Sequence, residues 1–300
     1  MSKYENDNLE VEDEDQYIMS MTTIHANMIK TLFETLKDIL TDVCIYFDHS
    51  GMKITSTNQS QNSLVYLNLT ANQINEGGVY SFNFTKPHFF IGVKLSTLYK
   101  VIKTISKGDK FSWFIHKNLP EILHIQLDDD TGSITTIFDY KLIEPDEEVI
   151  EFPELDYDYI FRIKSSDFTK RIKDMANIDI GDTMELEVIE NQMVISCSGM
   201  WVDQRTHIIG MNSNDKEDQM IDKDISKRNK KSPVKIEFLK NSKDKQRGKY
   251  KLKYLNIFTK ASDLCEKNKI YFGHQKPLVI EYPVPNLGML KFMLACEIEE

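Results

Sequence analysis

The 300-residue sequence predicts an α+β fold of two similar domains, each built from antiparallel sheets with two helices packed on one face. Two patterns lead to this prediction. A stretch with helical apolar spacing, followed by several short strand-like runs, recurs along the chain as an internal repeat. The strand-like runs alternate in polarity and are joined by short turns containing Gly, Asn or Asp, which favours antiparallel sheets over a parallel βαβ sheet.

The first domain is expected to span residues 21–143. Its helices are predicted at 28–40 and 95–105, where Leu, Ile and Phe recur at the spacing of one helix face. Its strands are predicted at 43–47, 52–56, 64–69, 111–115, 122–127 and 133–142. This order of helix and strands gives two copies of the repeat.

The second domain is expected to span residues 158–300 and to repeat the same order. Its helices are predicted at 167–177 and 253–263. Its strands are predicted at 183–189, 193–197, 234–239, 269–273, 278–282 and 290–295. Between the domains, residues 144–157 are rich in Glu and contain two prolines, which predicts an extended connector.

Two segments have the composition of irregular chain. Residues 1–20 are predicted to be a disordered acidic tail, because they hold too few apolar side chains to offset the entropy of ordering. Residues 212–249 form a lengthened charged segment that alternates acidic and basic runs. Its run Lys227–Lys231 fits a solvated loop, a nuclear address or an extra DNA contact, and the sequence leaves these readings open.

The chain carries no motif of catalysis, metal binding or cofactor binding. It contains no Walker, dinucleotide-binding or H-E-x-x-H pattern, so we expect no enzyme, no metal site and no cofactor. The run Asp128–Asp130 lacks the distal acid of an EF-hand and is predicted to be a hairpin turn. The cysteines are far apart, which suggests neither a zinc site nor a disulfide framework: Cys44, Cys197, Cys265 and Cys296.

No apolar run approaches the length of a membrane span, and no secretory leader is visible, so we expect a soluble intracellular protein. The formal net charge of −10 argues against general polyanion binding unless cations gather locally. Each predicted helix does carry cations on one side. They are Lys30, Lys37, Lys100, Lys103, Lys107, Lys170, Lys173, Lys253 and Lys260, with Arg171 adjacent. Such stripes are either ordinary solvated faces or, side by side, a surface that follows a phosphate backbone without reading bases.

Several runs resemble proliferating cell nuclear antigen, the eukaryotic DNA sliding clamp. They are Asp139–Leu142, Pro153 with Tyr157, Tyr254–Ala261, Pro277–Tyr282 and Leu290–Ala295, in this order along the chain. The resemblance implies a non-enzymatic processivity factor for DNA polymerase and a docking platform for replication and repair proteins. It also implies three subunits that close head to tail into a ring around double-stranded DNA, with the lysine-bearing helices lining the hole.

The same resemblance implies two further sets of site residues. The subunit interface would include Thr135, Ile137, Asp139, Tyr140, Leu142, Arg205, His207 and Ile209. The pocket for the short peptides of DNA polymerase, clamp loader and other partners would include Leu64, Ile150, Phe152, Pro153, Tyr157, Pro277, Met293, Ala295 and Cys296. Cys296 and Lys276 depart from the family pattern there, which puts the choice of partners in question.

The sequence is also compatible with other functions. The chain would also suit one subunit of a hetero-oligomeric, checkpoint-type clamp, and more remotely a diverged nuclease. A composition rich in Ile, Lys and Asn suits an AT-rich eukaryote or a large DNA virus. The expected location is accordingly the nucleus, or a cytoplasmic replication compartment if the chain is viral.

Overall fold

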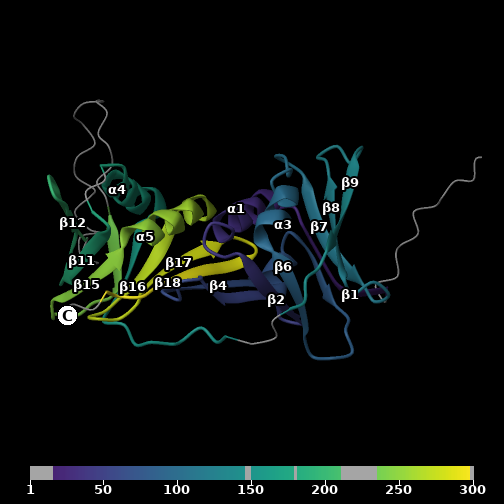
Figure 1. Cartoon of the computed structure of the whole chain (residues 1–300), viewed down its shortest axis with the longest axis horizontal. Helices are drawn as coiled ribbons and strands as arrows, with labels where there is room; N and C mark the ends of the chain where they lie inside the picture. Colours follow the sequence, from purple (N-terminus) through teal and green to yellow (C-terminus); the bar gives the residue numbers. More distant parts are fainter. Residues whose placement is uncertain (1–15, 146–149, 179–180, 211–234, 298–300) are drawn as a thin grey trace, which may run out of the picture.

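The structure is a computed structural model that describes residues 16–145, 150–178, 181–210 and 235–297 (Figure 1). The predicted acidic tail lies outside the described residues as far as residue 15, and the predicted charged segment lies outside them as far as residue 234. Every strand pair in the described part is antiparallel, so the predicted α+β class is confirmed.

The described strands form three sheets. In spatial order, the five-stranded sheet of the first domain holds β5 (Gly78–Phe82), β1 (Tyr17–Thr23), β7 (Lys110–His116), β8 (Ile122–Asp128) and β9 (Thr135–Lys141). The four-stranded sheet of the second domain holds β13 (Asp203–Ile209), β12 (Gln192–Ser198), β11 (Thr183–Ile189) and β15 (Gln246–Lys251).

A nine-stranded sheet runs through both domains. Its spatial order is β14 (Ile236–Lys240), β10 (Tyr159–Lys164), β16 (Lys267–Phe272), β17 (Leu278–Val284), β18 (Gly288–Leu294), β4 (Ser63–Thr70), β3 (Gly51–Thr57), β2 (Asp42–Asp48) and β6 (Phe89–Lys94). Buried and less buried residues alternate along β2, β4, β10 and β16, because one face covers the core and the other meets the outer surface.

The pairing of β4 with β18 joins the two domains. The pairing covers all of β18 and all of β4 except Thr70, from Ser63 opposite Leu294 to Leu69 opposite Gly288. Gly288 has φ of 155°, and a Cβ added there would lie 1.9 Å from the Asn68 carbonyl oxygen, so the close approach of the strands requires glycine. On β18, Phe292 is fully buried and stacks on Phe258 of helix α5 with ring centroids 4.4 Å apart.

β1 begins at Tyr17, earlier than the predicted domain start at Met21. Ile18 and Met19 are 2% and 0% exposed, and the strand lies between β5 and β7. The apolar run that starts at Tyr17 is thus long enough to hold a strand next to an acidic stretch, because its burial offsets the entropy of ordering those few residues.

The described helices are α1 (Ala26–Leu36), α2 (Ala71–Ile74), α3 (Leu95–Ile102), α4 (Ser165–Ile178), α5 (Leu252–Phe258) and the 3₁₀ helix η4 (Thr259–Leu264). α1, α3, α4 and α5 lie on one side of the nine-stranded sheet (Figure 1), whereas α2 packs against strands of the five- and nine-stranded sheets. In α1 the predicted residues Leu32, Phe33 and Leu36 are buried on one helix face together with Ile29.

Three predicted helices end earlier than their apolar spacing suggested, and the one predicted over 28–40 ends at Leu36. A threonine lies at the early end of the other two. The helix predicted to reach residue 105 ends at Ile102, and the Thr104 hydroxyl donates to the Val101 carbonyl at 2.7 Å. The helix predicted over 253–263 changes to 3₁₀ geometry at Thr259, whose hydroxyl donates to the Asn256 carbonyl at 2.7 Å. In both places a threonine side chain competes with the backbone for a carbonyl of the last turn.

The described part of the predicted connector from residue 150 onward is extended. Residues 150–157 contain no helix or strand and run along the side of the nine-stranded sheet opposite the helices (Figure 1). The end of the connector is held by Lys276, whose Nζ donates to the Asp156 carbonyl at 2.6 Å and pairs with Asp158 at 3.2 Å.

Truncation of Phe292 tests the domain joint. Phe292→Ala is expected to lower the free energy of unfolding by about 3–5 kcal/mol, because it removes a fully buried ring and leaves a cavity beside α5. Val79→Ala is the matched control, since Val79 on β5 is 54% exposed and its loss should change stability by less than about 0.5 kcal/mol. Urea unfolding followed by circular dichroism measures both, and equal effects would contradict the central role of the joint.

Candidate functional site

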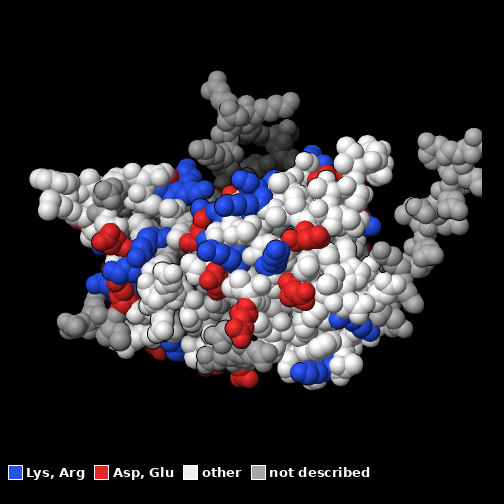
Figure 2. Space-filling view, turned by 45° about the vertical axis from the view of Figure 1, so that its right-hand side comes forward, with Lys and Arg blue, Asp and Glu red and all other residues white. Residues whose placement is uncertain are grey.

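The helices form one continuous row. α1 packs against α3 on one side and against η4 on the other, and α4 packs against α5 and η4 (Figure 1). The row therefore crosses the boundary between the domains. Figure 2 shows Lys and Arg side chains gathered over the middle of the molecule, with Asp and Glu side chains among them.

The cations that the sequence placed on the helices lie in this row or at its helix ends, apart from Lys107, and we call the whole set the helix face. They are Lys30, Lys37, Lys100, Lys103, Lys107, Lys170, Arg171, Lys173, Lys253 and Lys260. Lys37 and Lys103 are the residues that cap the ends of α1 and α3, and Lys107 lies in the turn between α3 and β7.

Part of the helix face is freely accessible. The side chains of Lys100, Lys103, Lys107, Lys170 and Lys173 are exposed. Within the described part of the chain, none of these five lysines forms an ion pair. Their charges are therefore available to an external anion.

Other cations of the helix face have intramolecular partners. The Lys30 ammonium donates to the Ile105 carbonyl at 2.8 Å, so it links α1 to the segment after α3. The Lys253 ammonium lies 4.7 Å from the centre of the Tyr254 ring, a cation–π contact. Lys30 is only partly exposed, whereas Lys253 is exposed as well as in contact with Tyr254.

One carboxylate binds two cations in the middle of the row. Asp38 follows α1 and pairs with Lys37 at 2.7 Å and with Lys260 of η4 at 2.5 Å, which joins the two domains. Partial burial alone would raise the pKa of Asp38, but hydrogen bonds from Lys260 and Lys37 hold that pKa below its ordinary value. The pairs are therefore formed at neutral pH, and their stabilising effect is lost only as the pH falls through the lowered pKa.

On the opposite side, the connector covers a groove of about 930 Å³, which we call the connector groove. Ile150, Phe152 and Pro153 line it from the connector, as expected for pocket residues. The sheet side supplies residues that sequence reasoning missed: Cys44, Tyr46, Lys53, Thr55, Tyr66, His88, Phe90 and Lys291. The signal for them was available, because tyrosines and a phenylalanine occupy outward strand positions where polar residues are usual.

Four predicted pocket residues pack together in a small cluster beside this groove. Leu64, Phe152, Tyr157 and Met293 form it with Val279, Ile160 and Tyr271, apart from the main core. Phe152 belongs to both features, since its ring lies 5.4 Å from that of Tyr66 and 5.6 Å from the Lys291 ammonium. The predicted pocket and the connector groove are thus continuous through Phe152.

The hydroxyl group of Tyr157 is buried in this cluster. It has no hydrogen-bond partner among the described residues, and burial raises the pKa of Tyr157 to about 12. A buried donor without a partner costs about 1–3 kcal/mol, which a bound polar group would recover.

The remaining predicted pocket residues lie at the edge of this region. Ala295 is exposed and its amide donates to the Asn62 carbonyl at 2.8 Å, while Pro277 is half-buried. Cys296 packs against the main core. Because Lys276 turns towards the connector, its departure from the family pattern secures the connector and does not fill the pocket.

The predicted subunit interface falls on strands with one open edge. Among the described strands, β9 pairs only with β8, and β13 pairs only with β12. Six of the predicted residues have accessible positions: Thr135, Ile137, Asp139, Arg205, His207 and Ile209. Tyr140 and Leu142 instead turn inward, and the Tyr140 hydroxyl is hydrogen-bonded to the backbone of Lys94.

The Asp128–Asp130 run forms the predicted hairpin turn between β8 and β9. Asp129 accepts hydrogen bonds from the Ser133 and Ile134 amides at 2.7 and 2.9 Å. The described residues contain no group of three or more His, Cys, Asp or Glu placed to hold a metal ion. None of the described helices is both long and apolar enough to cross a bilayer.

Comparison with known proteins adds independent findings. Residues 19–149 match the family described as proliferating cell nuclear antigen, N-terminal domain, and residues 151–297 match its C-terminal domain. The "Probable DNA polymerase sliding clamp 1" of Paramecium bursaria Chlorella virus 1 is 27% identical over 289 residues, which cover 94% of this chain and 98% of that protein.

A solved structure has the same fold. The crystal structure of proliferating cellular nuclear antigen from Entamoeba histolytica matches with a TM-score of 0.76 and 18% identity. The match covers 94% of this chain and 100% of that chain.

Two repeated domains, a continuous row of helices and a connector across the opposite face define a subunit of a sliding clamp. The two family matches together span nearly the whole chain, and the chain belongs to the proliferating cell nuclear antigen family. Clamps of this family are non-enzymatic processivity factors, so the protein is not an enzyme.

Proposed function

We propose that three copies of this chain close head to tail into a ring around double-stranded DNA and hold a DNA polymerase on it. This proposal rests mainly on the position of the open edges of β9 and β13. β9 lies at one end of the long axis of the molecule, and β12, which pairs with β13, lies at the other (Figure 1). Pairing of β9 with β13 of the next copy is a heterologous contact, which gives a ring when the rotation closes.

Ring closure also removes an aggregation hazard. Ile137 and Ile209 are 55% and 73% exposed on these edge strands. An exposed apolar edge strand is a template for uncontrolled pairing unless a defined partner covers it. A second copy of the chain is such a partner.

The helix face supports contact with duplex DNA. In a ring with the row of helices inside, the exposed lysines meet phosphates, and such contacts carry no sequence information. Phosphate contacts alone weaken steeply with salt, so retention on DNA would come from topology. The viral relative is named as a DNA polymerase sliding clamp, which supports the same role here.

The connector groove and the adjoining cluster support peptide docking. Aromatic side chains under a polar connector suit a short segment with aromatic anchors, contributed by the polymerase, a clamp loader or repair proteins. The Tyr157 hydroxyl, which has no partner among the described residues, offers a polar group of such a segment a hydrogen bond. We place the protein at the site of DNA synthesis, in the nucleus or in a cytoplasmic replication compartment of a virus.

The mass of the assembly in solution tests the ring. Sedimentation equilibrium is expected to give three times the 35.0 kDa chain mass. A stable monomer would contradict the proposal. Assembly only with a different clamp-like chain, seen by native mass spectrometry, would instead support a hetero-oligomeric clamp.

Charge reversal tests the helix face. Lys100→Glu/Lys103→Glu is expected to weaken binding to a short duplex and to reduce the slope of log affinity against log salt by about 0.9 per lost phosphate contact. Asp38→Asn should change binding in the opposite direction, because it releases Lys37 and Lys260 from their shared carboxylate. Fluorescence anisotropy at several salt concentrations measures both.

The control for that experiment is Lys86→Glu, an exposed lysine in the loop between β5 and β6, away from the helices. An equal loss of binding in this control would mean that only net charge matters. No change in the double reversal would make the helix face an ordinary solvated surface.

Truncation of Phe152 tests the docking site. Phe152→Ala is expected to weaken binding of a polymerase-derived peptide by about 2 kcal/mol or more, because an aromatic anchor residue shared by the groove and the cluster is lost. Titration calorimetry measures affinity, and sedimentation should show an unchanged ring. Leu155→Ala is the control, since Leu155 lies on the same connector, is 42% exposed and belongs to neither feature. Equal affinity of both variants would remove the connector from the site.

A further inference from the structure

The backbone of the two open edges restricts how β9 and β13 can pair. The N–H and C=O groups of alternate strand residues point to opposite edges. The Leu142 amide donates to the Glu121 carbonyl, so even-numbered residues of β9 face β8 and odd-numbered residues face the open edge. The Gly210 amide donates to the Asn191 carbonyl, so β13 follows the same rule. A pairing between the two edges must therefore match odd residues with odd residues.

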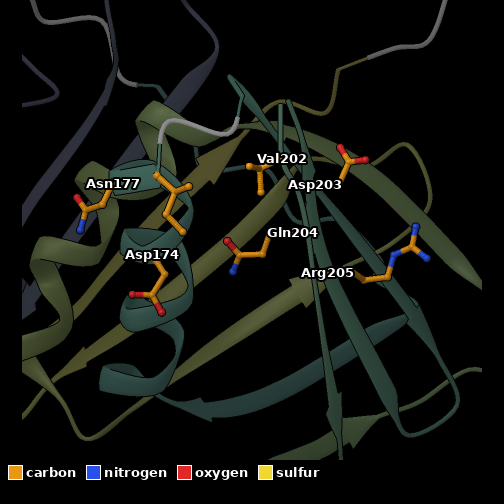
Figure 3. A pocket seen from close by; sticks show the side chains of 7 residues that line it. Asp174, Asn177, Val202, Asp203, Gln204 and Arg205 are labelled. Carbon is orange, nitrogen blue, oxygen red and sulfur yellow. The ribbon is translucent and has the colours of Figure 1, made fainter. Parts of the chain in front are cut away.

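The side chains obey the same rule. Figure 3 shows Val202 and Gln204 turned towards Asp174 and Asn177 of α4, whereas Arg205 points away from that helix. Odd-numbered residues are exposed along both strands, from Asp203 to Ile209 and from Thr135 to Lys141. Residues directly opposite each other in an antiparallel pair lie on the same sheet face, so odd-to-odd pairing keeps the exposed faces together.

Several registers match odd residues with odd residues, and the charges of the facing side chains distinguish between them. From these constraints we infer that Asp203 of one copy lies opposite Lys141 of the next and Arg205 opposite Asp139. A shift by two residues in one direction would set Asp203 against Asp139, and a shift in the other would set Arg205 against Lys141. Like charges directly opposite destabilise a strand pair, and opposite charges stabilise it. The inferred register alone makes two attractive pairs.

The ends of the strands agree with this register. β13 begins at Asp203 and β9 ends at Lys141, and the other ends, Ile209 and Thr135, also coincide. Beyond Lys141 the open edge is closed, because the Ile143 amide donates to the Gly92 carbonyl at 3.0 Å. Beyond Asp203 the chain leaves the strand in a turn in which the Gly199 amide donates to the Val202 carbonyl at 3.1 Å.

The inferred register also places the turn before β13 against the neighbouring copy. Met200 and Trp201 are 87% and 89% exposed in the single chain. The inferred pairing brings their turn next to Ile143, which lines a pocket of about 600 Å³ between β9 and α3 together with Val101. Two large apolar side chains would then be covered by the neighbouring copy, which explains why they stand in an otherwise exposed turn.

The register rests on the proposed ring, and a charge-swap cycle tests it separately. Lys141→Asp should weaken subunit association about 2- to 30-fold, because an attractive cross-strand pair becomes repulsive. Asp203→Lys alone should do the same, and the double variant should return to within about twofold of the unmodified protein. Lys141 is preferred to Asp139 because Asp139 also accepts a hydrogen bond from His124 Nδ1 at 2.8 Å.

Sedimentation at low salt over a concentration series measures the association, with Lys86→Glu as the control and thermal melting as the check on folding. An unmodified protein that is monomeric would overturn the ring itself. If Lys141→Asp leaves the association of the trimer unchanged or strengthens it, the register is wrong although the ring stands. The same holds if adding Asp203→Lys to Lys141→Asp does not restore the association. If Lys141→Asp does not fold, the single Asp203→Lys variant provides the test. A weakened trimer would then support the register, and an unchanged trimer would contradict it.

Discussion

The antiparallel pairing of β4 with β18 is the interaction on which the rest of the molecule depends. It joins two domains into one nine-stranded sheet, in a register that a slip of one residue would destroy by turning the core face to solvent. Because the sheets are joined there, α1 meets η4 and the helix row becomes continuous. For the same reason, the connector crosses one uninterrupted surface of the nine-stranded sheet.

An acidic chain presents a cationic surface only where its carboxylates are kept away or paired. Here the formal net charge is −10, yet exposed lysines of α3 and α4 stand at the two flanks of the row. Asp38 at the centre neutralises part of that charge while it ties α1 to η4. Partly exposed ion pairs contribute only about 0–1 kcal/mol, so the main effect of Asp38 is on local charge and not on stability.

Much of the fold was predictable because local patterns and tertiary packing agree. The apolar spacing of Leu32, Phe33, Leu36 and Leu40 predicted a helix, and the first three lie on its buried face while Leu40 follows its end. Some exceptions have local causes: threonine hydroxyls lie where two helical runs end early, and a short apolar run at Tyr17 forms a strand beside an acidic stretch. Family resemblance indicated Phe152 and its neighbours, but not the tyrosines of β2 and β4 that line the connector groove.

By itself, the sequence determined the class of fold, the two-domain repeat, the lysines of each helix and the extended connector, because periodicity and composition are local properties of a chain. Only the tertiary structure decided which lysines are accessible and which are bound by Asp38, which edge residues face outward, and that Tyr140 turns inward. These features depend on contacts between residues far apart in the chain. Spacing along one helix or strand does not specify what the next element brings against it.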